Sequence, residues 1–292
     1  ASNNTAVGRS ALSANTTGAA NTAVGKDALL DNSTGTNNVA VGENALANNT
    51  TADQSTALGQ NALLTNTTGA SNVAVGHDSL RLNTTASNNT AVGTDSLRVN
   101  TTGADNTAVG YSALLANTTG ANNVAIGKDA LDSNTTASNN VAIGVDALQT
   151  NTIGAESVAI GAFALNAQNP ASATSMYNVA VGHNSGAAIT TGNENTLIGG
   201  LAGDALTVGF ANIALGTHAL GSDTQGSRSV AIGKSALAAQ NFTSATNAYN
   251  VAVGEAAGLS VTTGTSNTLI GGLAGDAITT ASYNTAVGTS AL

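Results

Sequence analysis

The chain contains no cysteine and no tryptophan, and aromatic residues make up only 2% of its 292 residues. The absence of cysteine excludes disulfide bonds and thiolate metal sites. The shortage of large side chains excludes an ordinary globular core, because such a core is filled mainly by leucine, isoleucine and aromatic residues. Stability is therefore expected to come from backbone hydrogen bonds more than from a thick apolar interior.

Charge is scarce as well, with 8% charged residues and 7 Lys+Arg against 16 Asp+Glu, for a formal net charge of −9. This balance does not favour nucleic acid as a partner. The apolar fraction of 41% argues against intrinsic disorder, which requires low hydrophobicity with high net charge. No run of about 18 apolar residues is present, so no membrane contact is expected in this segment. Both ends lie inside a repeat, and the sequence is expected to be a fragment of a longer protein.

The chain does contain a strict repeat. A five-residue motif (Asn/Ser, Thr/Val/Ile, Ala/Leu, Val/Ile/Leu, Gly) ends at Gly8, at Gly25 and so on at constant spacing as far as Gly161. It then continues to Gly288 with only two longer steps, Gly161 to Gly182 and Gly233 to Gly254. A period of 17 is too short for a pair of helices and fits two short strands with two turns. The sequence therefore predicts an all-β chain, a β-solenoid (β-roll) of about 17 coils with 17 residues per coil.

The two longer steps are themselves repeated. The sequence Gln-Asn-x-x-Ser-Ala-Thr occurs at Gln168–Thr174 and returns at Gln240–Thr246. Each copy predicts a four-residue loop insertion in a continuous array. We therefore divide the chain into a regular 17-residue-repeat β-solenoid over residues 1–165 and a continuation over residues 166–292, which carries both insertions within a 72-residue super-repeat.

Side chains in the motif alternate between two faces, as in a strand. In the copy that begins at Ser157, that residue, Ala159 and Leu165 are expected to point inward, and Val158 and Ile160 outward. Over 17 coils spaced about 4.8 Å apart, the outward aliphatic side chains form a predicted apolar stripe roughly 80 Å long. Soluble monomers do not normally expose such a stripe, so self-association is predicted. The residues assigned to this core strand and interface are Val7, Val24, Val41, Val75, Val92, Val109, Ile126, Ile143, Ile160 and Ile232.

A second column of residues opens the sequence Asn-Thr-Thr-Gly-Ala. Asparagine occupies its first place in nine successive coils, from Asn15 to Asn151. Asparagine, threonine and glycine are typical turn residues, so these turns are expected to face water. Stacking at about 4.8 Å would let the asparagine side chains hydrogen-bond to one another as a ladder.

The motif copies Ser157–Gly161 and Ser229–Gly233 resemble the core motif of the YadA-like head of trimeric autotransporter adhesins. The longer unit, NTAVGxxAL followed by NTTG, is similar to repeats of phage tail fibres and bacterial surface fibres that carry an endosialidase-type chaperone domain. The resemblance extends over every coil. It implies a left-handed β-roll that forms a parallel homotrimeric fibre through the motif strand, located outside the cell on a cell surface or virion.

The sequence shows no catalytic constellation. His77, His183 and His218 fall in separate coils and are predicted to lie on the surface. The glycine-rich segments Leu197–Gly203 and Leu269–Gly275 lack the lysine and hydroxyl residue of a phosphate loop and predict a repacked coil instead. One place in the coil takes aspartate, asparagine or serine, which predicts hydrogen bonds to local backbone, with a cation held between stacked acids as the alternative. The aspartates at this place are Asp27, Asp78, Asp95, Asp129 and Asp146. We expect no enzyme activity, no cofactor and no metal.

The predicted function is that of a structural and adhesive fibre segment, which mediates or spaces attachment to a host or abiotic surface, a glycan or extracellular matrix. Irregular loops on a regular scaffold often carry recognition, although these residues would also serve to cap a change in coil width. The residues assigned to receptor loops are Pro170, Met176, Tyr177, Phe242 and Tyr249. Two alternatives are an ice-binding solenoid, which would use the threonine rows from Thr50-Thr51 to Thr135-Thr136, and a glycan-cleaving tailspike.

Overall fold

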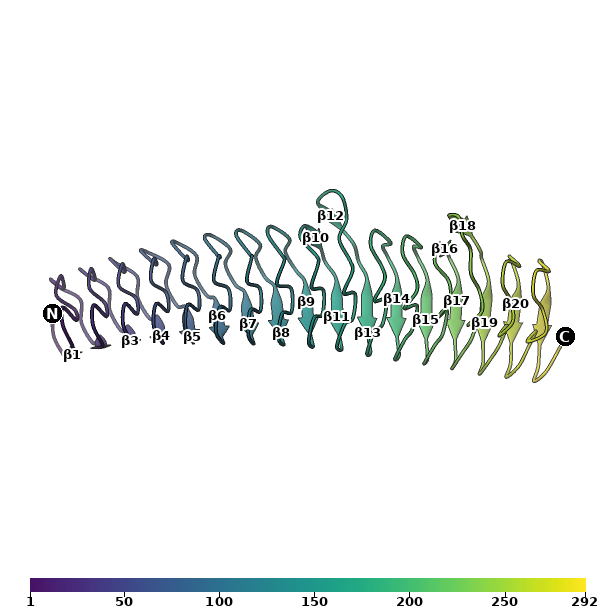
Figure 1. Ribbon diagram of the computed structural model, residues 1–292, viewed down its shortest axis with the longest axis horizontal. Coiled ribbons are helices and arrows are strands. Elements are labelled where there is room, and N and C mark those ends of the chain that lie inside the picture. The colour runs from purple at the N-terminus through teal and green to yellow at the C-terminus, as the bar shows by residue number, and fades with distance from the viewer. The chain divides into compact units, whose positions relative to one another are not determined.

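The computed structural model describes residues 1–292 and shows a parallel β-solenoid without helices. Its coils stack one after another within two compact units, Ala1–Asn140 (unit 1) and Val141–Leu292 (unit 2) (Figure 1). The prediction of an all-β solenoid with a 17-residue coil is confirmed, since strands in neighbouring coils pair Thr5 with Thr22 and Thr90 with Thr107. The predicted boundary at residues 165 and 166 lies inside unit 2. No segment forms a helix with the length and apolarity needed to cross a membrane.

Unit 1 contains eight strands of three residues, each paired in parallel and in register with the next. The strands are β1 (Thr5–Val7), β2 (Thr22–Val24), β3 (Val39–Val41), β4 (Thr56–Leu58), β5 (Val73–Val75), β6 (Thr90–Val92), β7 (Thr107–Val109) and β8 (Val124–Ile126). The single parallel sheet of unit 1 therefore runs along the stacking direction, with one strand per coil.

Unit 2 contains nine such strands in a second in-register ladder. They are β9 (Val141–Ile143), β11 (Val158–Ile160), β13 (Val179–Val181), β14 (Thr196–Ile198), β15 (Ile213–Leu215), β17 (Val230–Ile232), β19 (Val251–Val253), β20 (Thr268–Ile270) and β21 (Thr285–Val287). Two short pairs accompany the insertions: β10 (Gly154–Ala155) with β12 (Thr174–Ser175), and β16 (Gly226–Ser227) with β18 (Thr246–Asn247).

Each regular coil holds one strand, whereas the sequence predicted two. The remainder of the coil turns at residues with a left-handed backbone, such as Asp95 (φ 59°), Leu97 (φ 49°) and Asp105 (φ 59°). Aspartate and asparagine adopt this conformation more readily than other side chains, which explains why they share a place with one another. Leucine there carries a cost of roughly 1–2 kcal/mol, which burial of its whole side chain offsets.

The motif glycine closes the strand in a conformation that other residues rarely adopt. Gly76 has a φ of +134°, and a Cβ there would lie 2.6 Å from the carbonyl oxygen of Gly93 in the next coil. Glycine is therefore required for two reasons: the backbone angle and the close approach of the next coil.

The interior of the coil is lined by small apolar residues and by asparagine. The inward prediction for Ser157, Ala159 and Leu165 is confirmed, since all three are fully buried. The asparagine ladder is also confirmed: Asn100 Nδ2 donates to Asn83 Oδ1 at 2.9 Å and to the carbonyl oxygen of Gly103 at 2.9 Å. The prediction that these asparagines face water is wrong, because the column is fully buried from Asn32 onward. The side chains turn inward because their partners lie in the adjacent coil and in the same turn.

A second asparagine column precedes the strand. Asn89 Oδ1 accepts the backbone N–H of Asn106 at 2.9 Å, and Asn89 Nδ2 donates to the carbonyl oxygen of Gly103 at 3.0 Å. The turn carbonyl of Gly103 thus accepts hydrogen bonds from both columns. Buried amides such as those of Asn89 and Asn100 are thereby satisfied by a neighbouring coil, which removes the usual penalty for burying a polar group. Asn134 is an exception, since its Oδ1 is buried without a hydrogen-bond partner.

Unit 2 contains coils in which the interior is repacked, as the glycine-rich segments predicted. Glycine takes the left-handed place of the buried leucine at Gly186 (φ 59°) and Gly203 (φ 55°). A Cβ at Gly186 would lie 2.8 Å from Leu197 Cδ1, and one at Gly203 would lie 2.9 Å from Leu197 Cδ2. Leu197, which stands where other strands have alanine, fills the space left by both glycines. Gly258, Gly275 and Leu269 repeat this arrangement in the second copy of the super-repeat.

Replacing Asn100 by alanine should lower the free energy of unfolding by about 3 kcal/mol, because it leaves Asn83 Oδ1 without a donor and removes one buried hydrogen bond each from Asn117 Nδ2 and the Gly103 carbonyl. Urea denaturation followed by circular dichroism measures the change. Thr102→Ala, an exposed change in the same turn, is the control and should alter stability by less than about 0.5 kcal/mol. Equal effects of the two substitutions would contradict the ladder.

Candidate functional site

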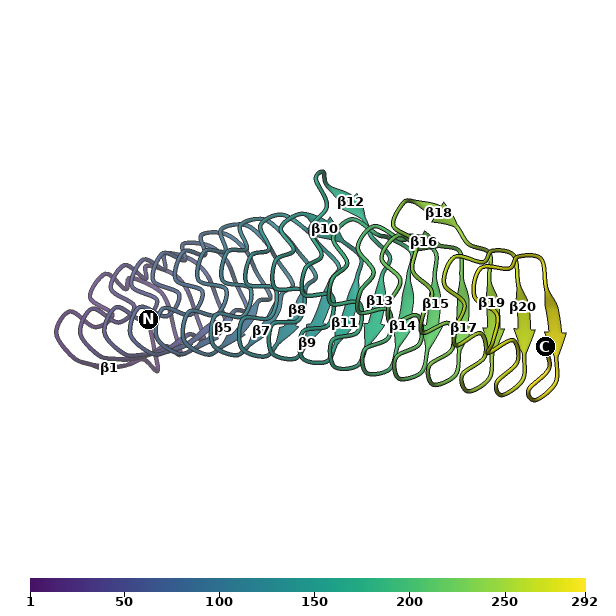
Figure 2. The same cartoon turned by 45° about the vertical axis from the view of Figure 1, so that its right-hand side comes forward.

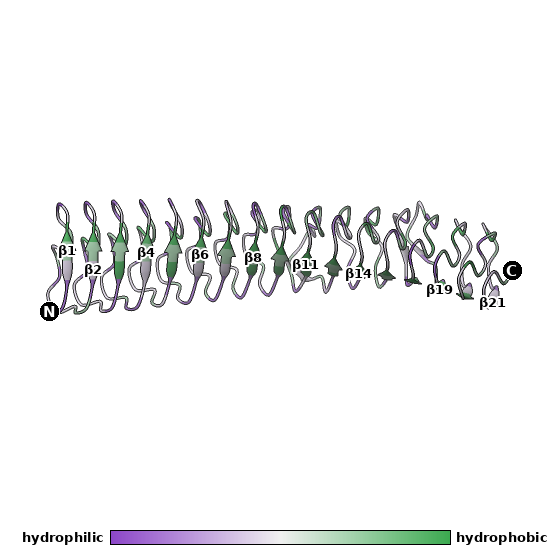
Figure 3. Ribbon diagram, turned by 90° about the horizontal axis from the view of Figure 1, so that it is seen from below, coloured by the Kyte–Doolittle hydropathy of each residue, from purple (hydrophilic) through white to green (hydrophobic).

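The outer face of the strands in unit 1 carries an unbroken row of aliphatic side chains. The third residue of each strand is valine, leucine or isoleucine, and all of these side chains are half-buried or exposed. Val7 is 59% exposed, Val92 36% and Ile126 39%, while the central alanines of β2 to β8 are fully buried. Figure 3 shows the hydrophobic colour on these strand arrows. No other part of unit 1 covers the row, as the sequence predicted.

Unit 2 has the same row on its own strands. The third strand residue is aliphatic in all nine coils, with Ile160 37% exposed, Ile198 37% and Ile270 40%. All the side chains that the sequence assigned to a self-association strand lie on the outer face in their respective units: Val7, Val24, Val41, Val75, Val92, Val109, Ile126, Ile143, Ile160 and Ile232. The name aliphatic row is used below for the third strand residues of each unit.

The insertions protrude from one edge of unit 2, where β12 and β18 stand out from the coils (Figures 1 and 2). The five residues assigned to receptor loops divide into two groups. Pro170, Met176 and Phe242 are buried and pack the widened turn. Tyr177 and Tyr249 are 57% and 53% exposed, and they are the two members available to a ligand.

Glutamine and serine adapt the interior to each insertion. In the coil that carries the first insertion, Gln168 takes the place of the turn asparagine, and Ser157 precedes the strand of the same coil. Gln168 Nε2 donates to Ser157 Oγ at 3.1 Å, and Asn178 Nδ2 donates to Gln168 Oε1 at 2.9 Å. The longer glutamine therefore crosses the coil to reach the shorter serine. Gln240 and Ser229 form the same contact in the second insertion, at 3.0 Å.

The coil before the second insertion also buries a carboxylate, Asp223, in the turn-asparagine column. It accepts hydrogen bonds from Gln240 Nε2 at 2.6 Å and from the backbone N–H groups of Gly226 at 2.9 Å and Phe242 at 3.1 Å. These three hydrogen bonds satisfy both oxygens of the buried carboxylate, and the bonds from Gln240 and Phe242 attach the insertion to the preceding coil.

The turns that pair with the two insertions carry opposite charge at one equivalent place of the super-repeat, Glu156 beside the first insertion and Arg228 beside the second. Hydrogen bonds from Ser175 and, to a smaller extent, Tyr177 lower the pKa of Glu156, because they stabilise its ionised form. Arg228 Nη1 donates to Asn247 Oδ1 at 2.6 Å. The sequence did not lead us to predict this pairing of charge with aromatic residues. Residues 17 positions apart, or 21 across an insertion, lie next to each other in adjacent coils. A comparison at these spacings would have paired Glu156 with Tyr177 and Arg228 with Tyr249.

The three histidines lie on the surface, as predicted, and His77 lies close to two aspartates. The ligand atoms of His77, Asp78 and Asp95 lie within 4.8 Å of one another. Arg81 Nη1 lies 3.4 Å from Asp78 Oδ2, and Arg98 Nη1 lies 3.7 Å from Asp95 Oδ1. Two guanidinium groups thus neutralise the two carboxylates, each within its own coil, so the arrangement suits ion pairing better than binding of a divalent cation.

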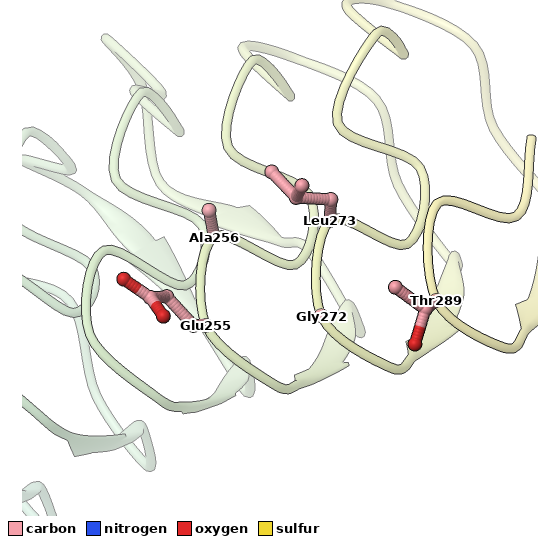
Figure 4. A pocket seen from close by; sticks show the side chains of 5 residues that line it. All are labelled: Glu255, Ala256, Gly272, Leu273 and Thr289. Carbon is pink, nitrogen blue, oxygen red and sulfur yellow. The ribbon is translucent and has the colours of Figure 1, made fainter.

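A shallow pocket of about 320 Å³ lies near the last coils of unit 2, lined by Glu255, Ala256, Gly272, Leu273 and Thr289 (Figure 4). Glu255, Gly272 and Thr289 occupy the same place in successive coils, and the missing side chain of glycine between them leaves the hollow. Its single carboxylate has no second acid or base among the lining residues, so the pocket does not provide the paired groups that glycan cleavage requires.

The threonine pairs contribute one exposed row of hydroxyl groups rather than two. The first threonine of each pair is turned along the stack, where Thr67 Oγ1 donates to the carbonyl oxygen of Thr84 at 3.0 Å and Thr84 Oγ1 to that of Thr101 at 3.1 Å. The second threonine, such as Thr85 or Thr102, is exposed. The ice-binding alternative therefore gains no support from the geometry.

Comparison with known protein families finds no family model that matches the sequence. No curated protein matches the chain either. Inferences about function are drawn from two features of the structure: the aliphatic row of each unit and the insertions with the exposed Tyr177 and Tyr249.

The insertion contacts predict a titration behaviour. Ser175→Ala should raise the pKa of Glu156 toward its ordinary value, and Tyr177→Phe should raise it by less, because each removes a hydrogen bond to the carboxylate. Since the folded pKa is depressed, the contribution of these hydrogen bonds is present above the unfolded pKa and is lost as the pH falls through the folded value. Carbon-13 NMR titration of the Glu156 carboxyl measures both shifts. An unchanged titration curve in Ser175→Ala would contradict the assignment.

Proposed function

We propose that this chain is a segment of an extracellular fibre that associates with copies of itself, as a parallel homotrimer, and mediates or spaces attachment to a surface or host cell. The single observation that supports this function is the uninterrupted aliphatic row on the strand face of each unit. The resemblance of the motif to YadA-like heads and to phage and bacterial fibres points in the same direction. A place on a cell surface or virion belongs to the same proposal.

The energetics of the row favour association over many coils rather than few. Covering a half-exposed valine or isoleucine contributes about 1–2 kcal/mol. Association of two or three chains costs several kcal/mol in lost translational and rotational freedom. One coil is therefore insufficient, but eight coils in register exceed this cost, and a repeat that places one aliphatic residue in each coil supplies them.

The remaining surface suits a passive, durable fibre. The turns expose threonine and other short polar side chains, and the few cations mostly pair with acids of the same coil, as Arg81 does with Asp78, or of the next coil, as Lys26 Nζ does with Glu43 Oε1 at 2.7 Å. Such a surface remains solvated when the strand face is covered. A rigid array of this kind holds a binding tip away from a surface, or presents its own weak contacts many times.

Ile126→Glu, placed on the exposed strand face of unit 1, should abolish self-association, because it would bury an unpaired carboxylate in an apolar interface at a cost of several kcal/mol. Sedimentation equilibrium of residues 1–292 should give the mass of three chains for the unchanged protein and of one chain for the variant. Thr102→Glu adds the same charge to an exposed turn and should remain trimeric. A single-chain mass for the unchanged protein at all concentrations would exclude the proposal.

The insertions provide a separate test of attachment. Replacing Tyr177 and Tyr249 together by alanine should reduce retention on the target surface by about fivefold or more, since an exposed aromatic anchor contributes over about 1 kcal/mol of binding. Tyr111→Ala is the matched control, because Tyr111 is also 53% exposed but lies in a regular coil of unit 1. Adhesion of the labelled chain to cell and abiotic surfaces is the measurement. Equal loss in both variants would assign attachment to the fibre as a whole.

A further inference from the structure

The two insertions have the same backbone plan but different chemistry. In the first, Glu156 is engaged by Ser175 and Tyr177. In the second, its counterpart Arg228 lies beside Asn247, Phe210 and Tyr249. A widened turn that only capped the coil would not need to change the sign of its charge. The outer surfaces beside the two insertions therefore differ in the sign of their charge.

Arg228 is held in position by aromatic and polar contacts. Its guanidinium carbon lies 4.9 Å from the centre of the Phe210 ring and 5.8 Å from that of Tyr249. Its Nη1 donates to Asn247 Oδ1 at 2.6 Å and lies 3.5 Å from the Tyr249 hydroxyl. Cation–π contacts and these hydrogen bonds restrict the side chain on an exposed edge. Little rotamer freedom would therefore be lost when a ligand binds.

Arg228 also differs from the other cations of the chain. The chain has 7 Lys+Arg, and six of them lie within 4.0 Å of a carboxylate oxygen: Arg9, Lys26, Arg81, Arg98, Lys128 and Lys234. Arg228 has no such partner, although acidic residues outnumber basic ones by 16 to 7. Its hydrogen bonds use one of the two terminal nitrogens, which leaves donors of the planar fork for a carboxylate.

We propose that the Arg228–Tyr249 edge of the second insertion binds a carboxylate-bearing sugar residue of a glycan. This inference rests on the proposed attachment function and names the ligand class of one insertion. The guanidinium takes the sugar carboxylate. The exposed Tyr249 ring packs against the apolar face of the pyranose. Asn247, whose Oδ1 accepts from Arg228, offers its Nδ2 to a sugar hydroxyl, and Thr246 Oγ1, which donates to the Ser244 carbonyl oxygen, can still accept a hydrogen bond. A highly charged polyanion is disfavoured, because a single fixed cation faces a chain of net charge −9.

The test measures binding of the full chain to sialyllactose and to galacturonic acid, which carry one carboxylate each, with lactose and the methyl ester of galacturonic acid as matched neutral probes, by saturation-transfer NMR and calorimetry. At least one acidic sugar should bind and its neutral counterpart should not. Arg228→Gln should weaken binding about tenfold or more, the effect of losing a charge-assisted pair. Lys234→Gln, which removes an exposed charge paired to Glu255 in the next coil, should leave affinity unchanged.

Binding of neither acidic sugar, or equal binding by Arg228→Gln, would overturn the inference. Tighter binding of a polyglutamate peptide than of either sugar would overturn the glycan assignment. Sedimentation of the same samples separates this result from the proposed fibre function. A trimer that retains adhesion but ignores acidic sugars refutes only the ligand, whereas a single chain that binds them refutes only the fibre.

Discussion

Hydrogen bonding between coils in strict 17-residue register is the constraint on which the structure depends. Asn100, the turn carbonyl of Gly103 and the backbone N–H of the motif glycine Gly76 each have a hydrogen-bond partner one coil away. A coil in isolation would bury unsatisfied amides and expose its backbone. Neighbouring coils therefore stabilise one another, which is the property that lets an array with almost no large side chains fold. The two asparagine columns perform the role that a thick apolar core performs in a globular domain.

Because buried side chains and backbone groups fix the register between coils, the residues at the outer positions can vary. The strand face keeps one aliphatic side chain in every coil, whereas the place after the motif glycine changes from Lys26 to Glu43 to His77 without altering the backbone. Function is accordingly assigned to outer residues: the aliphatic row to association, and the edge of the insertions to recognition. Even the insertions keep the rule, since Gln168 and Ser157 restore the interior hydrogen bonds that the wider turn would break.

The sequence predicted the period, the inward and outward faces and the repacked coils, because each depends on alternation or on substitution at a repeated place. It misplaced the turn asparagines. Asn-Thr-Thr-Gly is ordinary turn chemistry, and the burial of Asn100 follows only from partners supplied by adjacent coils. It also predicted a second strand in each coil, where the structure has a turn. That turn contains a left-handed leucine such as Leu97, a conformation that leucine normally avoids and that the sequence therefore did not suggest. The contact of Arg228 with Phe210 was missed for a related reason, because the two residues meet only when coils stack.

Register can be measured directly because the chain has no cysteine of its own. Cysteine pairs introduced at exposed threonines of unit 1 report which coils are neighbours. Thr102 and Thr119 are one coil apart, so their substituted thiols should lie about 5 Å apart and be bridged rapidly by a short bifunctional thiol reagent. Thr102 and Thr136 are two coils apart, at about 10 Å, and should be bridged poorly. Efficient bridging of the second pair, or none of the first, would contradict the in-register stacking from which every other conclusion follows.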